Sequence, residues 1–409
     1  MKLNVSERVA NLSASPIREL APLASKAEKE GKTVYHLNLG EPDLPTVSAF
    51  MDGVRNPRIL SLPYGPAQGM PQTLDAWQSY YAEQLIELAT DEMCVTAGAS
   101  EALSFAIKVT LDPGDELLLF EPFYPSYRGH AQLSNVQTVP VSTYAEDSFH
   151  LPDTEAIEKK ISSRTRAILF SNPGNPTGVV YSKPELRRIC DIAVKHELFV
   201  IADEIYREYV YEGKPTSVLA LPRLREHAIV VDSVSKRLSA CGARIGLIAS
   251  RNKAVMAAVL KMAQTCLPPP RLGQYGLIAF QSDPEHRQAV DAIIRTFRAR
   301  RDKAYNAIRS IHDVICRKPA GAFFMICKVP ITDSADFARW LLLDFEREGE
   351  TVMVAPMRGF YQTPRLGRDE VRIAYVLEEE KLLHAIGLLG DGLAEYREAC
   401  SRTTRGVSS

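Results

Sequence analysis

The 409-residue chain lacks the sequence features of several large classes of protein. Its seven cysteines are scattered without a CxxC pair, which argues against a disulfide framework or a structural zinc site. No apolar run approaches the roughly 18 residues of a membrane-spanning helix, and the first residues, MKLNVSERVANL, lack the apolar core of a secretory signal. We therefore expect reduced thiols, no metal site and a cytoplasmic protein.

An excess of charge of one sign is also missing. The chain has 49 Lys and Arg residues against 50 Asp and Glu residues, and its formal net charge is -1. Proteins that bind nucleic acid or an anionic membrane surface usually carry a cationic patch, so neither partner is expected. Hydrophobic residues make up 45% of the chain, which argues against a disordered protein and allows a large buried core.

What the sequence does contain is a series of short apolar runs separated by helix-sized intervals. Continuous runs of Val, Ile and Leu are typical of strands that are buried on both faces of a mainly parallel sheet, and their alternation with helices predicts an α/β fold. The runs span residues 93–98, 116–122, 166–173, 198–204, 228–235 and 243–250. A long amphipathic helix is expected over residues 285–308, and strands are expected at residues 321–329 and 370–377. These later elements indicate a smaller α+β domain.

Polar motifs follow four of the expected strands, and ligands of open α/β sheets bind beyond the carboxyl ends of the strands. The first motif places Gly98, Ala99 and Ser100 at a turn into a helix, whose free amides and positive dipole end suit a phosphate. Read alone, Ser100 could simply cap this helix. The second motif is the string SNPGNPTG over residues 171–178, in which Asn175 could hold its amide against a ligand or merely shape a turn.

The third and fourth motifs carry charge. Asp203 ends an apolar run in ADEIY, where a buried carboxylate needs a cationic partner and Tyr206 lies close in sequence. A helix N-cap is the simpler interpretation of Asp203. Lys236 follows the run that ends in SVS, and a desolvated lysine amine is competent to form an imine with a carbonyl. Ser233 and Arg244 flank this lysine and could bind a phosphate together.

The ordered set of GAS (98–100), NPTG (175–178), DEIY (203–206) and SVSK followed by Arg244 resembles the fold type I pyridoxal phosphate enzymes. More narrowly, it is similar to the class I and II aminotransferases of the aspartate aminotransferase superfamily, from Gly40 to Arg372. The resemblance implies an α/β fold with a mainly parallel seven-stranded sheet in a large cofactor-binding domain of residues 45–285. A smaller α+β domain would combine residues 1–44 and 286–409.

The resemblance also implies a role for each motif residue. Lys236 would bind pyridoxal 5'-phosphate as a Schiff base and move the substrate's α-proton, and Asp203 would pair with the ring nitrogen. Asn175 and Tyr206 would donate hydrogen bonds to the ring oxygen, and Tyr124 would stack on the ring. The phosphate would be bound by Gly98, Ala99, Ser100, Ser233 and Arg244, and Tyr64 would contact the cofactor of a partner subunit. The substrate would be bound by Gly40, Asn175 and Arg372. Without the resemblance, Arg372 would be interpreted as an exposed strand arginine.

The implied activity is transamination between an L-amino acid, with aspartate as the best candidate, and a 2-oxo acid such as 2-oxoglutarate. A homodimer with shared active sites would carry it out in two half-reactions. A β-lyase, an eliminating synthase or an oxidative enzyme would use the same cofactor residues. A non-catalytic ligand-sensing module is disfavoured, because the roughly 30 residues before the similar region leave no room for a helix-turn-helix domain. A nicotinamide dehydrogenase is disfavoured because no GxGxxG follows a strand.

Three arginines have no role in the family pattern, and two of them bear on which substrate the protein binds. Arg237 follows the lysine directly, where many relatives carry a smaller residue, and its role is left open. Arg271 ends the string LPPPR, and Arg358 lies in VAPMRGF. Arg271 and Arg358 could each bind a substrate side chain or be an ordinary surface charge.

Overall fold

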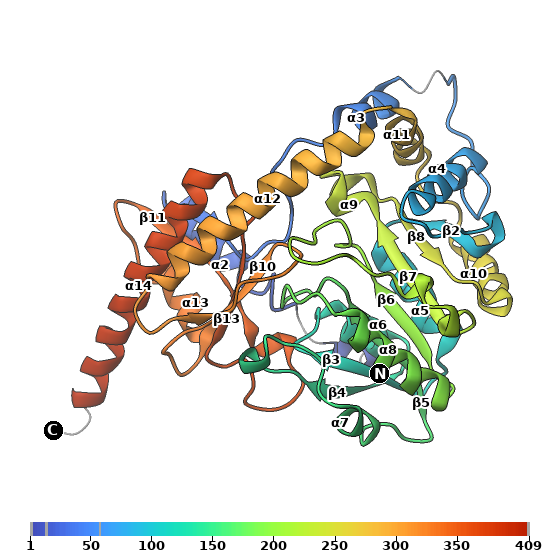
Figure 1. The fold of residues 1–409 in the computed structure, drawn as a ribbon. Coiled ribbons are helices and arrows are strands. Elements are labelled where there is room, and N and C mark those ends of the chain that lie inside the picture. Colours follow the sequence, from blue (N-terminus) through green and yellow to red (C-terminus); the bar gives the residue numbers. More distant parts are fainter. Residues whose placement is uncertain (1–2, 13–14, 57–58, 407–409) are drawn as a thin grey trace.

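A seven-stranded sheet forms the centre of the computed structural model, which describes residues 3–12, 15–56 and 59–406 (Figure 1). The strand order is β2-β8-β7-β6-β5-β3-β4. β8 runs antiparallel to both of its neighbours, and the other adjacent pairs are parallel. The predicted α/β fold with a mainly parallel sheet is therefore confirmed. The strands are β2 (Met93–Thr96), β3 (Glu116–Glu121), β4 (Gln137–Ser142), β5 (Thr165–Ser171), β6 (Phe199–Asp203), β7 (Ala228–Ser233) and β8 (Gly246–Ala249).

Helices cover both faces of this sheet, which explains why the strand sequences are apolar without alternation. Successive side chains of a strand point to opposite faces: Leu117 and Leu119 of β3 pack with α5, α6 and α10, and Leu118 and Phe120 belong to the core that includes α4, α8 and α11. These helices are α4 (Pro71–Ala82), α5 (Ala99–Thr110), α6 (Ser126–Leu133), α8 (Lys183–Lys195), α10 (Lys253–Cys266) and α11 (Arg271–Ser282).

Two smaller sheets form around a further core that joins the beginning and the end of the chain. β1 (Thr33–His36) pairs in parallel with β11 (Glu350–Met353). The four-stranded sheet has the order β12-β13-β10-β9. Its strands are β9 (Ile315–Cys316), β10 (Phe324–Lys328), β12 (Ala355–Pro356) and β13 (Glu370–Ala374). Residues from the N-terminal segment therefore fold with elements more than 300 positions later.

The long helix α12 (His286–Arg309) runs from the side of α3 (Ser48–Arg55) and α11 to α14 (Glu379–Gly406) (Figure 1). It matches the helix predicted over residues 285–308. The remaining helices are α1 (Glu7–Ala10), α2 (Ala21–Lys29), α7 (Thr154–Glu158), α9 (Val234–Arg237) and α13 (Ser334–Leu343). Across the described ranges, no helix combines the length and apolarity needed to cross a membrane.

Candidate active site

A cavity of about 720 Å³ lies beyond the carboxyl ends of the parallel strands, where the central sheet meets the smaller sheets. Most of the predicted site residues line it, although they come from distant motifs. They are Gly40, Ala99, Ser100, Tyr124, Asn175, Asp203, Tyr206, Lys236, Arg244 and Arg372. Gly98, Ser233 and Tyr64 are not among the lining residues.

Lys236 presents its amine to this cavity from the short helix α9, directly after β7. Its Nζ donates a hydrogen bond to the carbonyl oxygen of Gly40 at 2.6 Å and lies 3.6 Å from Sγ of Cys241. The Tyr209 hydroxyl holds the Lys236 carbonyl at 2.8 Å. The Tyr209 contact therefore fixes the Lys236 backbone. Among the described residues the amine has no carboxylate partner, so the nitrogen stays available for chemistry.

Asp203 ends β6 and is 5% exposed. The Tyr127 hydroxyl donates to its Oδ2 at 2.7 Å, and the amide of Ile205 donates to its Oδ1 at 3.3 Å. Burial raises the pKa of Asp203 to about 6, although both hydrogen bonds oppose the rise. The N-cap interpretation is wrong, because turns rather than a helix follow Asp203. A cationic ligand atom would stabilise this buried carboxylate.

Arg372 lies in the middle of β13 and is 1% exposed, so the interpretation as a surface arginine is wrong. Its Nη1 donates to Oδ1 of Asn175 at 2.9 Å, and its Nη2 donates to the Asn38 carbonyl at 2.6 Å. The guanidinium carbon lies 4.3 Å from the centre of the Phe324 ring, and Nε has no partner within the described part of the chain. Burial lowers the pKa of Arg372 to about 10, which leaves it charged at neutral pH. This geometry is suited to binding an anion.

A second cationic end of the cavity lies at the start of α5. Gly98, with a φ of +86°, is the N-cap of α5, so Ser100 lies inside the first turn of the helix and is not its cap. Arg244 donates to the carbonyls of Cys241 at 3.0 Å and Ala97 at 3.2 Å. A Cβ atom on Gly98 would lie 2.2 Å from Nη2 of Arg244. The glycine therefore lets the helix N-terminus and the guanidinium approach each other, as a phosphate site requires.

Ser233 lies behind this end of the cavity and is fully buried. Its hydroxyl donates to the Ile245 carbonyl at 2.7 Å and accepts the Ser235 amide at 3.1 Å. Ser235, which the motif contains but which we did not predict as a site residue, lines the cavity instead. The phosphate contact predicted for Ser233 stays a prediction.

Besides Tyr127, which contacts the buried carboxylate, two further tyrosines belong to the site. Tyr206 is 4% exposed and packs edge-on against Phe323 and Phe324. Burial raises its pKa well above the usual value, so its hydroxyl stays protonated at neutral pH. Tyr124 lines the cavity, and its ring is perpendicular to that of Tyr127 at a centroid distance of 5.6 Å. Tyr127 was missed by the sequence reasoning, although it lies in the same string, PFYPSY.

Tyr64 and the three unassigned arginines lie outside the main cavity. Tyr64 is 81% exposed and lines a separate cavity of about 430 Å³ with Arg271. Arg237 is buried against the rings of Trp77 and Tyr80. The Arg358 side chain is 69% exposed, with Asp333 at 4.0 Å. Neither Arg237 nor Arg358 therefore lies where a substrate in the main cavity would contact it.

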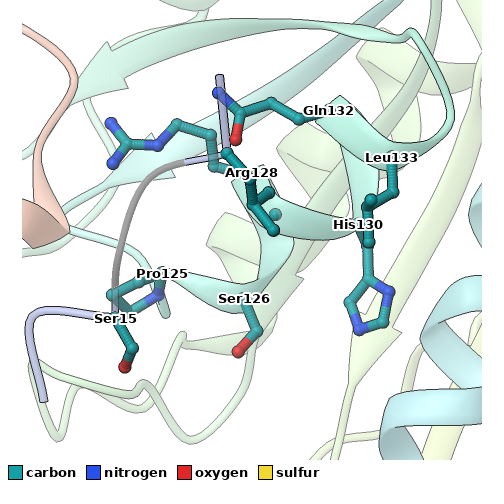
Figure 2. A pocket seen from close by; sticks show the side chains of 9 residues that line it. Ser15, Pro125, Ser126, Arg128, His130, Gln132 and Leu133 are labelled. Carbon is teal, nitrogen blue, oxygen red and sulfur yellow. The ribbon is translucent and has the colours of Figure 1, made fainter. Parts of the chain in front are cut away.

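Several cavity residues come from the N-terminal segment. They were not predicted as site residues, because the sequence before Gly40 contains no recognisable motif. Ser15, Ile17, Arg18 and Glu41 line the main cavity. A smaller adjoining cavity of about 200 Å³ shares Ser15 and Ser126 with it. Figure 2 shows this smaller cavity, with Ser15 near Pro125 and with further side chains from α6, including Arg128 and His130.

The fold and this site define a pyridoxal phosphate-dependent enzyme of fold type I. Residues 44–389 match the family described as aminotransferase class I and II. The chain belongs to this family, so it is a transaminase that uses pyridoxal phosphate and acts on small amino acid and oxo acid substrates.

Relatives cover nearly the whole chain. The aspartate aminotransferase of Pyrococcus horikoshii is 28% identical, with 96% of this chain and 98% of the relative covered. A solved alanine aminotransferase from Pyrococcus furiosus has a TM-score of 0.88 at 28% identity, covering 96% of this chain and 100% of its own. A Thermus thermophilus aspartate aminotransferase with maleate has a TM-score of 0.86 at 27% identity, with the same coverage. Enzymes named for different amino acids are thus similar to this chain to nearly the same degree.

Proposed function

We propose that this protein transfers the amino group between an L-amino acid, aspartate in the first place, and a 2-oxo acid, 2-oxoglutarate in the first place. The observation that carries this proposal is the buried guanidinium of Arg372 in the same cavity as the Lys236 amine. The described residues give Arg372 no acidic partner, and a substrate α-carboxylate would supply one. The fork of a guanidinium binds a carboxylate through two hydrogen bonds and so fixes its orientation.

The residues around the cavity fit the cofactor. When bound at Lys236, pyridoxal phosphate supplies an electron sink for the substrate carbon that loses its proton. Asp203 would keep a proton on the ring nitrogen, which also removes the penalty for a buried carboxylate. Nδ2 of Asn175 and the hydroxyl of Tyr206 would donate hydrogen bonds to the ring oxygen, and Tyr124 would stack on the ring.

Substrate orientation follows from the Arg372 network. Asn175 accepts a hydrogen bond from Arg372 through Oδ1, so one amide would connect the carboxylate site with the cofactor site. Gly40 allows close approach, because a Cβ there would lie 2.6 Å from Cζ of Phe324. A substrate held in this way would direct its α-hydrogen to the Lys236 amine, which would accept that proton as a general base.

The cofactor phosphate would bind the amides of Ala99 and Ser100 together with Arg244, and the contact implied for the buried Ser233 stays a prediction. We expect Gly98→Ala to weaken cofactor affinity by roughly 10- to 100-fold, which corresponds to the loss of one charge-assisted hydrogen bond. The added Cβ would displace the Arg244 guanidinium, only 2.2 Å away. The measurement is a titration of the cofactor-free variant with pyridoxal phosphate, followed by absorbance.

Gly114→Ala is the matched control for backbone strain. Gly114 also has a positive φ, +94°, but a Cβ there has nothing within 4 Å. We expect this variant to lose some stability while keeping its cofactor affinity. Equal affinity losses in the two variants would contradict a specific role for the contact between Gly98 and Arg244.

The proposed enzyme is a cytoplasmic homodimer with shared active sites. Tyr64 is exposed beside the second cavity, and Leu60, Leu62 and Leu267 are also more than half exposed. Exposed apolar residues of this kind support an interface between copies, across which Tyr64 would contact the partner's cofactor phosphate. The proposed division into a large domain of residues 45–285 and a small domain of residues 1–44 and 286–409 would put the cavity between the two domains.

A single-turnover experiment separates transamination from elimination or oxidation. The cofactor-loaded protein is mixed with an amino acid in the absence of any oxo acid, and the 2-oxo acid and the cofactor absorbance are measured together. We expect one equivalent of oxo acid per site and conversion of the cofactor to its amine form. Catalytic release of ammonia, pyruvate or peroxide would instead show a lyase or oxidative enzyme and overturn the proposal.

A further inference from the structure

The proposed function leaves one positive charge of the main cavity without a role. The charged side chains that line it are Arg18, Glu41, Asp203, Lys236, Arg244 and Arg372. Lys236 and Asp203 serve the cofactor ring, Arg244 its phosphate, and Arg372 the α-carboxylate. Arg18 and Glu41 remain, and both belong to the N-terminal segment.

The backbone around Arg18 is held in a defined place. The amides of Arg18 and Glu19 donate to the Ser15 carbonyl at 2.9 and 2.8 Å, which forms a turn. Pro16 is buried and packs on Gly359, where a Cβ would lie 2.5 Å from the Pro16 Cβ. The turn is therefore attached to the smaller sheets, although it lies more than 300 residues away from Gly359 in sequence.

Asn38 connects this turn to the proposed carboxylate anchor. Its Nδ2 donates to the Ile17 carbonyl at 2.9 Å, and its own carbonyl accepts Nη2 of Arg372 at 2.6 Å. One residue thus fixes Arg372 and the residue directly before Arg18. The backbone before Arg18 and the Arg372 guanidinium are therefore held by the same residue, and both arginines line the same cavity.

The Arg18 side chain is exposed and, in the ranges described, has neither a hydrogen-bond nor an ion-pair partner. A surface arginine often has none, so its freedom alone would mean little. Its place in the lining of the cavity is the second observation. A guanidinium there adds an anion site to a cavity that already has one for the α-carboxylate.

We propose that Arg18 binds the distal carboxylate of the substrate side chain and so selects dicarboxylic amino acids and oxo acids. This inference rests on the proposed function and names the residue that sets its substrate class. Arg372 would bind the carboxylate next to the reacting carbon, and Arg18 the carboxylate at the far end. Glu41 would repel that second carboxylate, so its charge would weaken the binding of dicarboxylic substrates. Removing the Glu41 charge can therefore be compared with removing the Arg18 charge.

Arg18→Gln is the direct test. Loss of a charge-assisted hydrogen bond should lower kcat/KM for aspartate and glutamate by roughly 10- to 100-fold. The value for alanine should change by less than about threefold, because alanine has no group at that end. Arg18→Lys should fall between the wild type and Arg18→Gln, since it keeps the charge but loses the planar fork. Succinate, an unreactive dicarboxylate, should raise the Tm of the loaded wild type more than that of Arg18→Gln.

Three comparison variants make the result specific. Arg358→Gln removes an exposed arginine outside the cavity and should leave the preference for dicarboxylates unchanged. Glu41→Gln should maintain or increase that preference. Arg271→Gln tests the rival site next to Tyr64, which would reach the substrate only from a second copy. A loss of the preference in Arg271→Gln but not in Arg18→Gln would overturn the proposal.

Failure of the proposal and failure of the proposed function give different results. A wild type that transaminates neutral amino acids as well as aspartate, or an Arg18→Gln variant with unchanged selectivity, would overturn the role of Arg18 and leave transamination intact. No conversion of the bound cofactor with any amino acid would instead overturn the proposed function. Every outcome therefore supports or contradicts one of the two statements.

Discussion

Replacing Lys236 with alanine should lower the rate of multiple-turnover transamination by about four orders of magnitude or more, because one side chain would serve both as the point of attachment and as the proton carrier. Among the described residues that line the main cavity, no lysine other than Lys236 is present. Its nearest polar neighbours, the Gly40 carbonyl and the Cys241 thiol, cannot form the same bond. Steady-state assays with aspartate and 2-oxoglutarate measure the loss.

A chemical readout keeps this result separate from misfolding. Borohydride reduction followed by mass spectrometry should add one cofactor to the wild type and none to Lys236→Ala. Lys253→Ala, which removes an exposed lysine at the start of α10, should retain both the activity and the mass increase. Normal multiple turnover by Lys236→Ala would contradict the assignment.

The strands of the central sheet show what apolar runs can and cannot predict. Six runs were recognised because both faces of their strands are buried, as for β3, where all six residues are buried. β4 was missed because Pro140 interrupts its pattern, and this is tolerated because β4 lies at the edge of the sheet. The antiparallel direction of β8 was not predicted, since a pattern of burial carries no information about strand direction.

The candidate site divides in a similar way. Residues at or just after strand ends, such as Asp203 and Lys236, could be predicted because their motifs are local and parallel strands bring their carboxyl ends together. Asn38 and Arg18 could not, because their place depends on contacts across more than 300 residues, from Arg372 to Asn38 and from Gly359 to Pro16. No local pattern encodes such contacts.

Asp203→Asn should stabilise the cofactor-free protein at pH 7 by up to about 3 kcal/mol relative to the wild type, while lowering the affinity for the cofactor. Burial raises the pKa of Asp203 to about 6, from an ordinary value of 3.8. The stabilisation that protonated Asp203 gives is fully present below about pH 4 and is lost as the pH rises through 6. At 1.36 kcal/mol per pKa unit, this difference is about 3 kcal/mol.

Urea denaturation of both cofactor-free proteins at pH 4.5 and pH 7 measures the effect. Their free energies of unfolding should differ by only about 1 kcal/mol at pH 4.5, where Asp203 is protonated in the folded protein, and by up to about 3 kcal/mol at pH 7. Comparing the two proteins reduces the contribution of Glu204, which both contain and whose pKa burial raises to about 7 in the wild type. With pyridoxal phosphate bound, the order at pH 7 should reverse, because a protonated ring nitrogen would pair with the carboxylate but not with an amide. An Asp203→Asn variant that gains as much stability from the cofactor as the wild type does would contradict this pairing.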